Sequence, residues 1–322
     1  MAPAPVDRLE ILVVVDNYAD ALLPSEPGVE RPPVGNGETL PTDTLLAEHG
    51  LCLLLTAHRG ASRTGILLDA GYSPVAAPRN LKLLREPLDH VESLVISHGH
   101  EDHVGAVDEL LSMAGRPSVV VHPDAFLHPR FFPGDDGRLY RIPEMLIREG
   151  LTERGVQILD SKEPVLLGEG AFLVTGEIPR ATPFERALPG AVREVNGRRI
   201  PDPVPDDQGV VIDVAGLGLI VVSGCAHAGI VNTVRHARRL VPGRPLHTVL
   251  GGFHLSGSAS RDAIAPTIEA LRAESPKRVV PMHCTGIEAK ARMREAFGDR
   301  YAESAVGTRF TFPHETSVDE DI

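Results

Sequence analysis

The chain has 322 residues, a formal net charge of −12, 42% hydrophobic and 24% charged residues, and three cysteines. This is a globular composition, and no apolar run approaches the length of a membrane-spanning helix, so no membrane partner is expected. The acidic balance, with only two short arginine clusters, also argues against nucleic acid as a partner. Cys52, Cys225 and Cys284 are odd in number and widely spaced, which argues against a disulfide framework. The N-terminal stretch lacks the features of a signal peptide, so a cytoplasmic protein is expected.

Apolar runs of strand length alternate with polar turns in the first half of the chain, and two stretches between them show helical spacing. The predicted strands are at residues 9–15, 50–56, 65–71, 92–98 and 118–123, and the predicted helices at 75–86 and 104–115. In the second half we expect strands near 155–160, 171–176, 208–214, 217–223, 247–251 and 278–282, and helices near 229–241, 261–274 and 287–297. This pattern predicts two stacked sheets with helices outside, each half of the chain supplying one sheet and its helices.

Two stretches do not fit this scaffold. Residues 127–150 and 178–207 are rich in proline, glycine and arginine and are predicted to be long surface loops. Long loops in compact domains are often functional, so we expect them to form a cap over the site, with passive connections as the alternative. The whole chain, residues 1–322, is expected to be a single domain.

Three histidines and an aspartate crowd into one short loop. His98, His100, Asp102 and His103 follow the apolar run LVIS directly and precede the predicted helix. Asp102 alone fits a helix N-cap. Burying all four groups without a partner is costly, whereas a divalent cation accepts imidazole nitrogens and a carboxylate oxygen together. The cluster therefore predicts a metal site.

These residues form the motif HGHEDH, and through it the sequence resembles the metallo-β-lactamase superfamily, whose hallmark is His-x-His-x-Asp-His. Further motifs are similar to the branch of dihydropterin ribofuranosylaminobenzene-phosphate synthase-like proteins: EHGLCLLL (48–55), ILLDAGYSP (66–74), TGEIPR (175–180), SGCAHAGIVNT (223–233), GGFHL (251–255) and PMHCTG (281–286). The resemblance covers nearly the whole chain. It implies a four-layer αββα sandwich with two metal positions at one edge. Because this fold hosts several reaction types and noncatalytic relatives, the reaction has to be inferred from the site.

The resemblance also implies the metal ligands. His98 and His100 would bind the first metal, and Asp102 and His103 the second. The third histidine of the first metal is expected near TGEIPR, where this sequence has none, so His227 is predicted to replace it. Glu177 in TGEIPR is left open as a contact to metal, to Arg180 or to neither.

Two further positions leave alternatives. Cys225 stands where relatives carry a bridging aspartate, and we favour a small buried residue there over a thiolate ligand. For the last ligand of the second metal we choose His283 over His254, and we assign His254 to substrate binding or proton transfer. The other histidines, from His49 to His314, are expected to be surface or core residues, with His122 as a further candidate for the metal edge.

The predicted activity is that of a metallo-hydrolase with Asp102 and His254 as catalytic residues and one or two divalent ions per chain. Zinc is expected, with iron or manganese as alternatives. Glu177, Arg180 and His254 are expected to bind a small anionic substrate such as a phosphoester, lactone or thioester. One alternative is a synthase or lyase that forms or breaks a C–C or C–N bond on a pterin-like or phosphoribosyl substrate. Another is a noncatalytic metal-binding sensor, and a homodimer is left open.

Overall fold

The structure is a computed structural model, and it describes residues 2–35, 39–134 and 136–313. His314 lies outside the described residues. Within them, no helix has both the length and the apolar character needed to cross a bilayer.

The first large sheet has eight strands in the order β2-β18-β1-β3-β4-β5-β6-β9. Strands β18, β1, β3 and β4 pair antiparallel, whereas β4, β5, β6 and β9 run parallel, so the carboxyl ends of these four strands share one edge. The strands are β1 (Arg8–Val15), β2 (Val29–Glu30), β3 (Cys52–Arg59), β4 (Ser62–Leu68), β5 (Val91–Val95), β6 (Ser118–Val121), β9 (Ile158–Asp160) and β18 (Arg309–Pro313).

The second large sheet has six strands in the order β10-β11-β14-β15-β16-β17. Its last three strands are parallel, so they also end at a common edge. The strands are β10 (Val165–Leu167), β11 (Phe172–Val174), β14 (Gly209–Val214), β15 (Gly218–Ser223), β16 (Leu246–Gly252) and β17 (Arg278–Met282).

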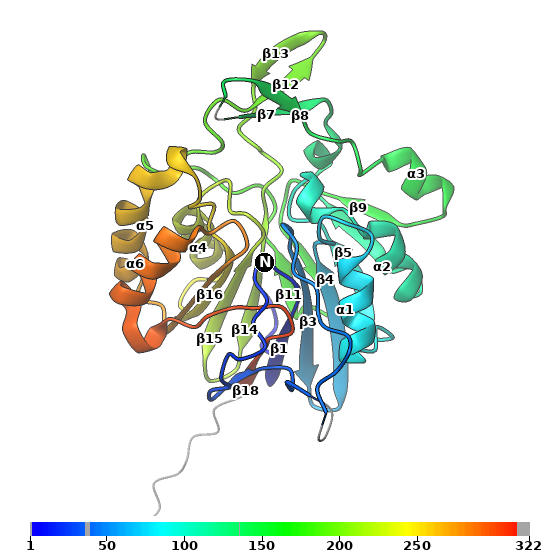
Figure 1. The fold of residues 1–322 in the computed structure, drawn as a ribbon, viewed down its shortest axis with the longest axis vertical. Coiled ribbons are helices and arrows are strands. Elements are labelled where there is room, and N and C mark those ends of the chain that lie inside the picture. The colour runs from blue at the N-terminus through cyan, green and yellow to red at the C-terminus, as the bar shows by residue number, and fades with distance from the viewer. Residues whose placement is uncertain (1, 36–38, 135, 314–322) are drawn as a thin grey trace, which may run out of the picture.

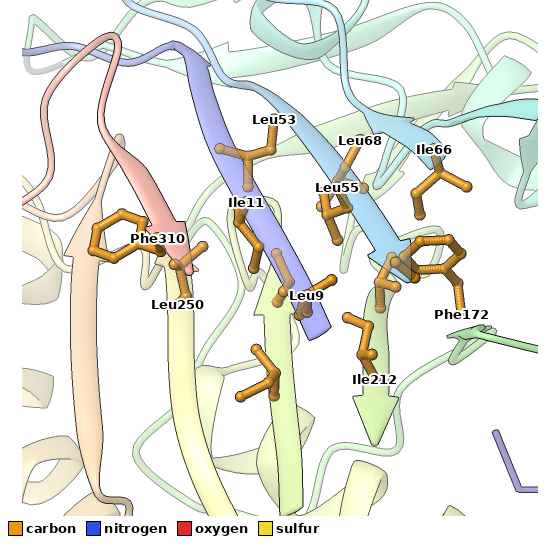
Figure 2. Packing of buried hydrophobic residues seen from close by; sticks show 14 of the residues in the cluster. Leu9, Ile11, Leu53, Leu55, Ile66, Leu68, Phe172, Ile212, Leu250 and Phe310 are labelled. Atoms are coloured by element: carbon orange, nitrogen blue, oxygen red, sulfur yellow. The ribbon is translucent and has the colours of Figure 1, made fainter. Parts of the chain in front are cut away.

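The two sheets pack face to face over one apolar core. Figure 2 shows Leu9, Ile11, Leu55, Phe172 and Ile212 in this layer, all fully buried. Because successive strand residues point to opposite faces, Leu12 and Val14 of β1 pack instead against the helices outside the sheet.

Helices cover the outer face of each sheet (Figure 1). Over the first sheet lie α1 (Ala76–Leu84) and α2 (Val107–Met113), and over the second lie α4 (Ile230–Leu240), α5 (Arg261–Glu274) and α6 (Ile287–Phe297). The four layers confirm the predicted αββα sandwich. One part of the prediction is wrong: the two halves do not supply the sheets separately, because β18 returns to pair with β1 in the first sheet.

The two stretches that the sequence predicts as loops contain strands, which corrects that prediction. They supply a third sheet with the order β13-β12-β7-β8, and we call this sheet and its connections the cap. It lies above the sandwich at the top of Figure 1. Its strands are β7 (Arg130–Pro133), β8 (Leu139–Arg141), β12 (Val192–Val195) and β13 (Arg198–Pro201), and a helix follows β8, namely α3 (Arg148–Glu153).

The hairpin β12–β13 has a visible sequence signal. Asn196 and Gly197 alone connect the two strands, with φ angles of 51° and 72°. An Asn-Gly pair with positive φ at both positions is the preferred two-residue hairpin turn. The dipeptide is therefore the local sequence feature that encodes this hairpin.

Candidate metal centre

The candidate site lies where parallel strands of both large sheets end. His98 and His100 follow β5, and Asp102 and His103 form the short helix η1 (Glu101–His103). From the second sheet, Cys225 and His227 follow β15, whereas His254 follows β16 and His283 follows β17.

Backbone turns aim these side chains back over the sheet edge. Ala226, His254 and His283 have φ angles of 55°, 47° and 50°, in the left-handed region that few non-glycine residues adopt. The two sheet edges also approach closely, because a Cβ atom on Gly224 would lie 2.0 Å from Ser97 Oγ. The backbone strain of these positive φ angles persists where the surrounding structure imposes it, as at binding sites.

The first ligand group consists of His98, His100 and His227. His98 Nε2 lies 3.0 Å from His100 Nδ1 and 3.1 Å from His227 Nε2, and all three residues are buried. Burial first, and then the nearby imidazoles, lowers the pKa of His98 and His227 well below the usual range. Neutral imidazole is the form that binds a metal.

The second ligand group consists of Asp102, His103 and His283. His283 Nε2 lies 3.2 Å from His103 Nε2 and 3.3 Å from Asp102 Oδ2. Asp102 also joins a group with His98 and His100, so this carboxylate lies between the two sets of histidines. Buried ring nitrogens that face one another and a carboxylate form a donor set that suits divalent cations.

Cys225, for which the sequence favours a small buried residue over a thiolate ligand, is buried beside both ligand groups. Its Sγ lies 3.2 Å from His103 Nε2. It belongs to one group with Asp102, His103 and His283 and to another with His98 and His227, with the candidate ligand atoms of each group within 4.8 Å of one another.

Residues behind the ligands fix their rings. Asp69 Oδ2 lies 2.6 Å from His103 Nδ1 and accepts a hydrogen bond from Ser97 Oγ at 2.7 Å. Asn17 Oδ1 lies 3.0 Å from His283 Nδ1. Burial opposes protonation of His103, but the carboxylates of Asp102 and Asp69 outweigh it and raise the pKa of His103 to about 9. Such partners orient metal-binding histidines. Sequence reasoning missed Asp69 and Asn17, although Asp69 directly follows β4 at the same edge.

A buried ion network connects the cap to the metal loop. Arg130 of β7 is fully buried, and its guanidinium lies 2.6 Å from Asp206 Oδ1 and 3.3 Å from Asp202 Oδ2. Asp206 Oδ2 accepts a hydrogen bond from the backbone N–H of Gly99, between the ligands His98 and His100, at 2.8 Å. The network therefore joins the two chain stretches that form the cap to the loop that carries His98 and His100.

Arg180 and Glu177, which the sequence predicts as substrate contacts, make other contacts in the structure. The Arg180 guanidinium donates hydrogen bonds to the carbonyl of His227 at 2.5 Å and to that of Val204 at 3.0 Å, and it also donates to the Pro203 carbonyl. These contacts hold the Arg180 side chain against the backbone of His227 and of the cap, and Arg180 is not among the residues that line the large cavity. The side chain of Glu177 is half exposed and 3.8 Å from His122 Nε2, and among the described residues it belongs to no ligand group.

A cavity of about 1480 Å³ opens beside the ligand groups and reaches the cap. His283 and His254 line it, and the His254 ring centroid lies 4.4 Å from that of His227. Burial and then His283 lower the pKa of His254 to about 4, so its ring is neutral at pH 7. His49, to which the sequence assigned no role, also lines the cavity, and its Nε2 lies 3.6 Å from Asp102 Oδ2.

An αββα sandwich with histidine, aspartate and cysteine donors gathered at the ends of its parallel strands defines a class of metal-binding proteins. The chain belongs to the metallo-beta-lactamase superfamily, whose family model matches residues 48–283. This confirms the resemblance predicted from the HGHEDH motif.

The chain also has named relatives. The chain is 29% identical over 270 residues to 7,8-dihydropterin-6-methyl-4-(beta-D-ribofuranosyl)-aminobenzene-5'-phosphate synthase of Methanocaldococcus jannaschii, covering 83% of this chain and 90% of the relative. A shorter match, 30% identical over 113 residues, covers 31% of this chain and 20% of ribonuclease J of Mycobacterium tuberculosis. Among solved structures, Tm1679, a metal-dependent hydrolase of the beta-lactamase superfamily, is 23% identical with a TM-score of 0.71 and covers 95% of this chain and 99% of that chain. This structural likeness bears on the fold alone.

Proposed function

We propose that the protein is a metal-dependent hydrolase of a small anionic substrate. The observation that carries the proposal is a pair of adjoining buried ligand groups beside one large cavity, which His283 of the second group lines together with His254. The residues that would hold the metals are His98, His100 and His227 on one side and Asp102, His103 and His283 on the other. Divalent ions bound there supply Lewis-acid activation of water and of a substrate oxygen at neutral pH.

The chain's own residues orient the reactants and transfer the proton. The Asp102 carboxylate, a member of the second group, also lies beside His98 and His100 of the first, where it would orient the attacking water. His254 lines the cavity beside His227, and its neutral ring accepts a proton during attack and returns it to the leaving group. His49, 3.6 Å from Asp102, is a second group that can orient this carboxylate.

The cavity wall indicates the kind of substrate. Lys290 and Arg294 of α6 supply positive charge, and Phe132 and Leu188 of the cap supply apolar contact. Both cations also pair with Glu303 on the same wall, so an anionic group that binds them would compete with this carboxylate. Phosphoesters, lactones and thioesters with an apolar portion fit this wall, because pockets of this kind bury apolar surface and orient the ligand by a few polar groups.

A second candidate is a synthase or lyase acting at a C–C or C–N bond of a pterin-like or phosphoribosyl substrate. Two observations favour it. The Methanocaldococcus jannaschii relative, matched over 90% of its length, is named a synthase, and the cavity of about 1480 Å³ has room for a two-part substrate.

Product analysis separates these candidates. Protein reconstituted with zinc is offered a panel of phosphoesters, lactones and thioesters, and in parallel a panel of pterin-like compounds with a phosphoribosyl compound. Hydrolysis that His254→Asn reduces at least 100-fold, and that the remote His58→Asn leaves unchanged, supports the first candidate. Coupled product without hydrolysis supports the second. Bound metal with no turnover on either panel contradicts both and favours a sensor.

A further inference from the structure

We infer that Lys290 and Arg294, held against Glu303, form a subsite for a phosphate monoester that lies away from the reacting bond of the substrate. The inference deepens the proposed function and rests on it, because it concerns what the same cavity binds. It separates the anionic group of the substrate from the group that reacts at the metal centre.

One face of α6 forms a wall of the cavity. Ile287, Lys290 and Arg294 all line it, at the spacing of three and four residues that places side chains on one face of a helix. The helix begins at Ile287, four residues after His283 of the second ligand group. From Ile287 to Arg294 the helix rises by about 10 Å. The two cations therefore lie farther along the wall from the metal centre than Ile287 does.

The strand beside this helix gives the same order. Tyr301 forms a bridge to Val279 near the start of β17, whereas His283 follows the end of that strand. The four residues from Val279 to His283 span about 13 Å of extended chain. Tyr301 and Glu303 also line the cavity. The charged end of the cavity is thus roughly 10 Å from the metal centre, which is too far for one phosphate group to contact both.

Four side chains gather at this charged end. Glu303 Oε1 lies 3.6 Å from Lys290 Nζ, and Glu303 Oε2 accepts a hydrogen bond from Tyr301 Oη at 2.9 Å. Arg294 also pairs with Glu303, and its guanidinium lies 5.1 Å from the centroid of the Tyr301 ring. The side chains of Lys290 and Glu303 are only 15% and 17% exposed. One carboxylate thus holds two cations in place beside the cavity.

The Glu303 carboxylate sets a charge threshold for the ligand. An anion that binds here has to take over contacts that Lys290 and Arg294 make with Glu303. A carboxylate only exchanges one negative charge for another, whereas a phosphate monoester brings close to two charges and three acceptor oxygens. Arginine forks onto two phosphate oxygens, and lysine binds phosphate as a point charge. The cluster therefore favours a phosphate monoester over a carboxylate.

Apolar side chains on the cavity wall indicate the rest of the ligand. Ile287 lies on α6 between the metal centre and the two cations, and it is 88% exposed. Phe132 of the cap lines the same cavity and is 45% exposed. Covering these side chains with an apolar group removes them from water, which favours binding. The substrate would thus carry an apolar stretch between its reacting bond and its phosphate.

Equilibrium binding of two matched probes tests the subsite without turnover. Butyl phosphate and pentanoate have similar apolar tails, but at about pH 8 the first carries two charges and the second one. Isothermal titration calorimetry measures both with the zinc-loaded wild type and with His98→Ala/Asp102→Ala, in which each ligand group lacks a member. We expect butyl phosphate to bind both proteins. In the double variant it should bind roughly 10-fold more tightly than pentanoate, or better.

Single changes added to this double variant test the residues. Lys290→Gln should weaken the binding of butyl phosphate roughly 10-fold, whereas Lys277→Gln, an exposed lysine between α5 and β17, should not change it. Glu303→Gln should tighten the binding of pentanoate and narrow the gap between the two probes. Glu295→Gln, an exposed carboxylate on the same wall, should leave that gap unchanged. Circular dichroism checks that each variant is folded.

The outcomes separate the subsite from the proposed function. Butyl phosphate that binds only the zinc-loaded wild type, or neither protein, overturns the subsite and leaves the proposed function standing. Unchanged affinity in Lys290→Gln, or a gap between the probes that Glu303→Gln does not narrow, overturns it as well. A protein that binds butyl phosphate as described but hydrolyses no compound of the panel overturns the proposed function and leaves the subsite.

Discussion

The buried ion network that joins the cap to the metal loop should dominate the stability of this region. Arg130→Met removes a fully buried guanidinium from two carboxylates, Asp206 at 2.6 Å and Asp202 at 3.3 Å. Burial opposes ionisation of Asp206, but Arg130 outweighs it and lowers the pKa of Asp206 from 3.8 to about 2. This lower pKa corresponds to a net stabilisation of the ionised Asp206 carboxylate by roughly 2 kcal/mol, with the cost of its burial already included.

Without Arg130, this gain is lost and two buried carboxylates remain unpaired. Removing one partner of a buried ion pair costs about 3–5 kcal/mol, and we expect a loss of this size in the free energy of unfolding. Urea denaturation at pH 7 measures it. The matched control is Arg138→Met on the same cap, where the side chain is 80% exposed and 3.6 Å from Asp136, and the expected change is below about 1 kcal/mol.

A companion variant tests the cause of the loss. Arg130→Met combined with Asp202→Asn and Asp206→Asn removes the unpaired charges and should recover much of the lost stability. If Arg130→Met alone unfolds within about 1 kcal/mol of the wild type, the reasoning is refuted, because the network would then contribute no more than a surface pair.

Three further predictions concern acid stability, the core and one glycine. Because the folded pKa of Asp206 is lowered, its contribution to stability is fully present above about pH 4 and is lost as the pH falls toward 2; Asp206→Asn should flatten this part of a curve of urea midpoint against pH. Phe172→Ala, in the layer between the sheets, should cost about 3–5 kcal/mol in urea denaturation, and a loss below about 1 kcal/mol would contradict the packing described. Gly229→Ala should lower the melting temperature more than Gly243→Ala, because both glycines have positive φ but only a Cβ at 229 would lie 2.2 Å from Glu185 Cδ; equal losses would count against this clash.

The sequence predicts best what is encoded locally. The HGHEDH motif gives four candidate ligands within one loop, and strand ends point to His227 and His283. The αββα layers follow from the spacing of apolar residues. The Asn196-Gly197 hairpin was also encoded locally, but the proline-rich and arginine-rich composition around it concealed the signal.

The remainder depends on contacts between distant parts of the chain. Arg130 pairs with Asp206 across 76 positions, and nothing near either residue indicates that both are buried. Arg180 lies on the expected stretch, but only the folded backbone shows its donors directed at the His227 and Val204 carbonyls. Cys225 could be weighed from the sequence by its residue type and by its place where relatives carry an aspartate, whereas its approach to donors of both groups requires the two sheets to be in place.

Metal content per chain tests the central claim most directly. Protein purified without added metal and the variant His98→Ala/Asp102→Ala are compared by elemental analysis, with both shown to be folded. We predict about two divalent ions per wild-type chain, zinc foremost, and near-complete loss in the variant, because the two changes remove a ligand from each group. Equal metal content in the two proteins, or a folded wild type with no metal after zinc is supplied, would contradict the account.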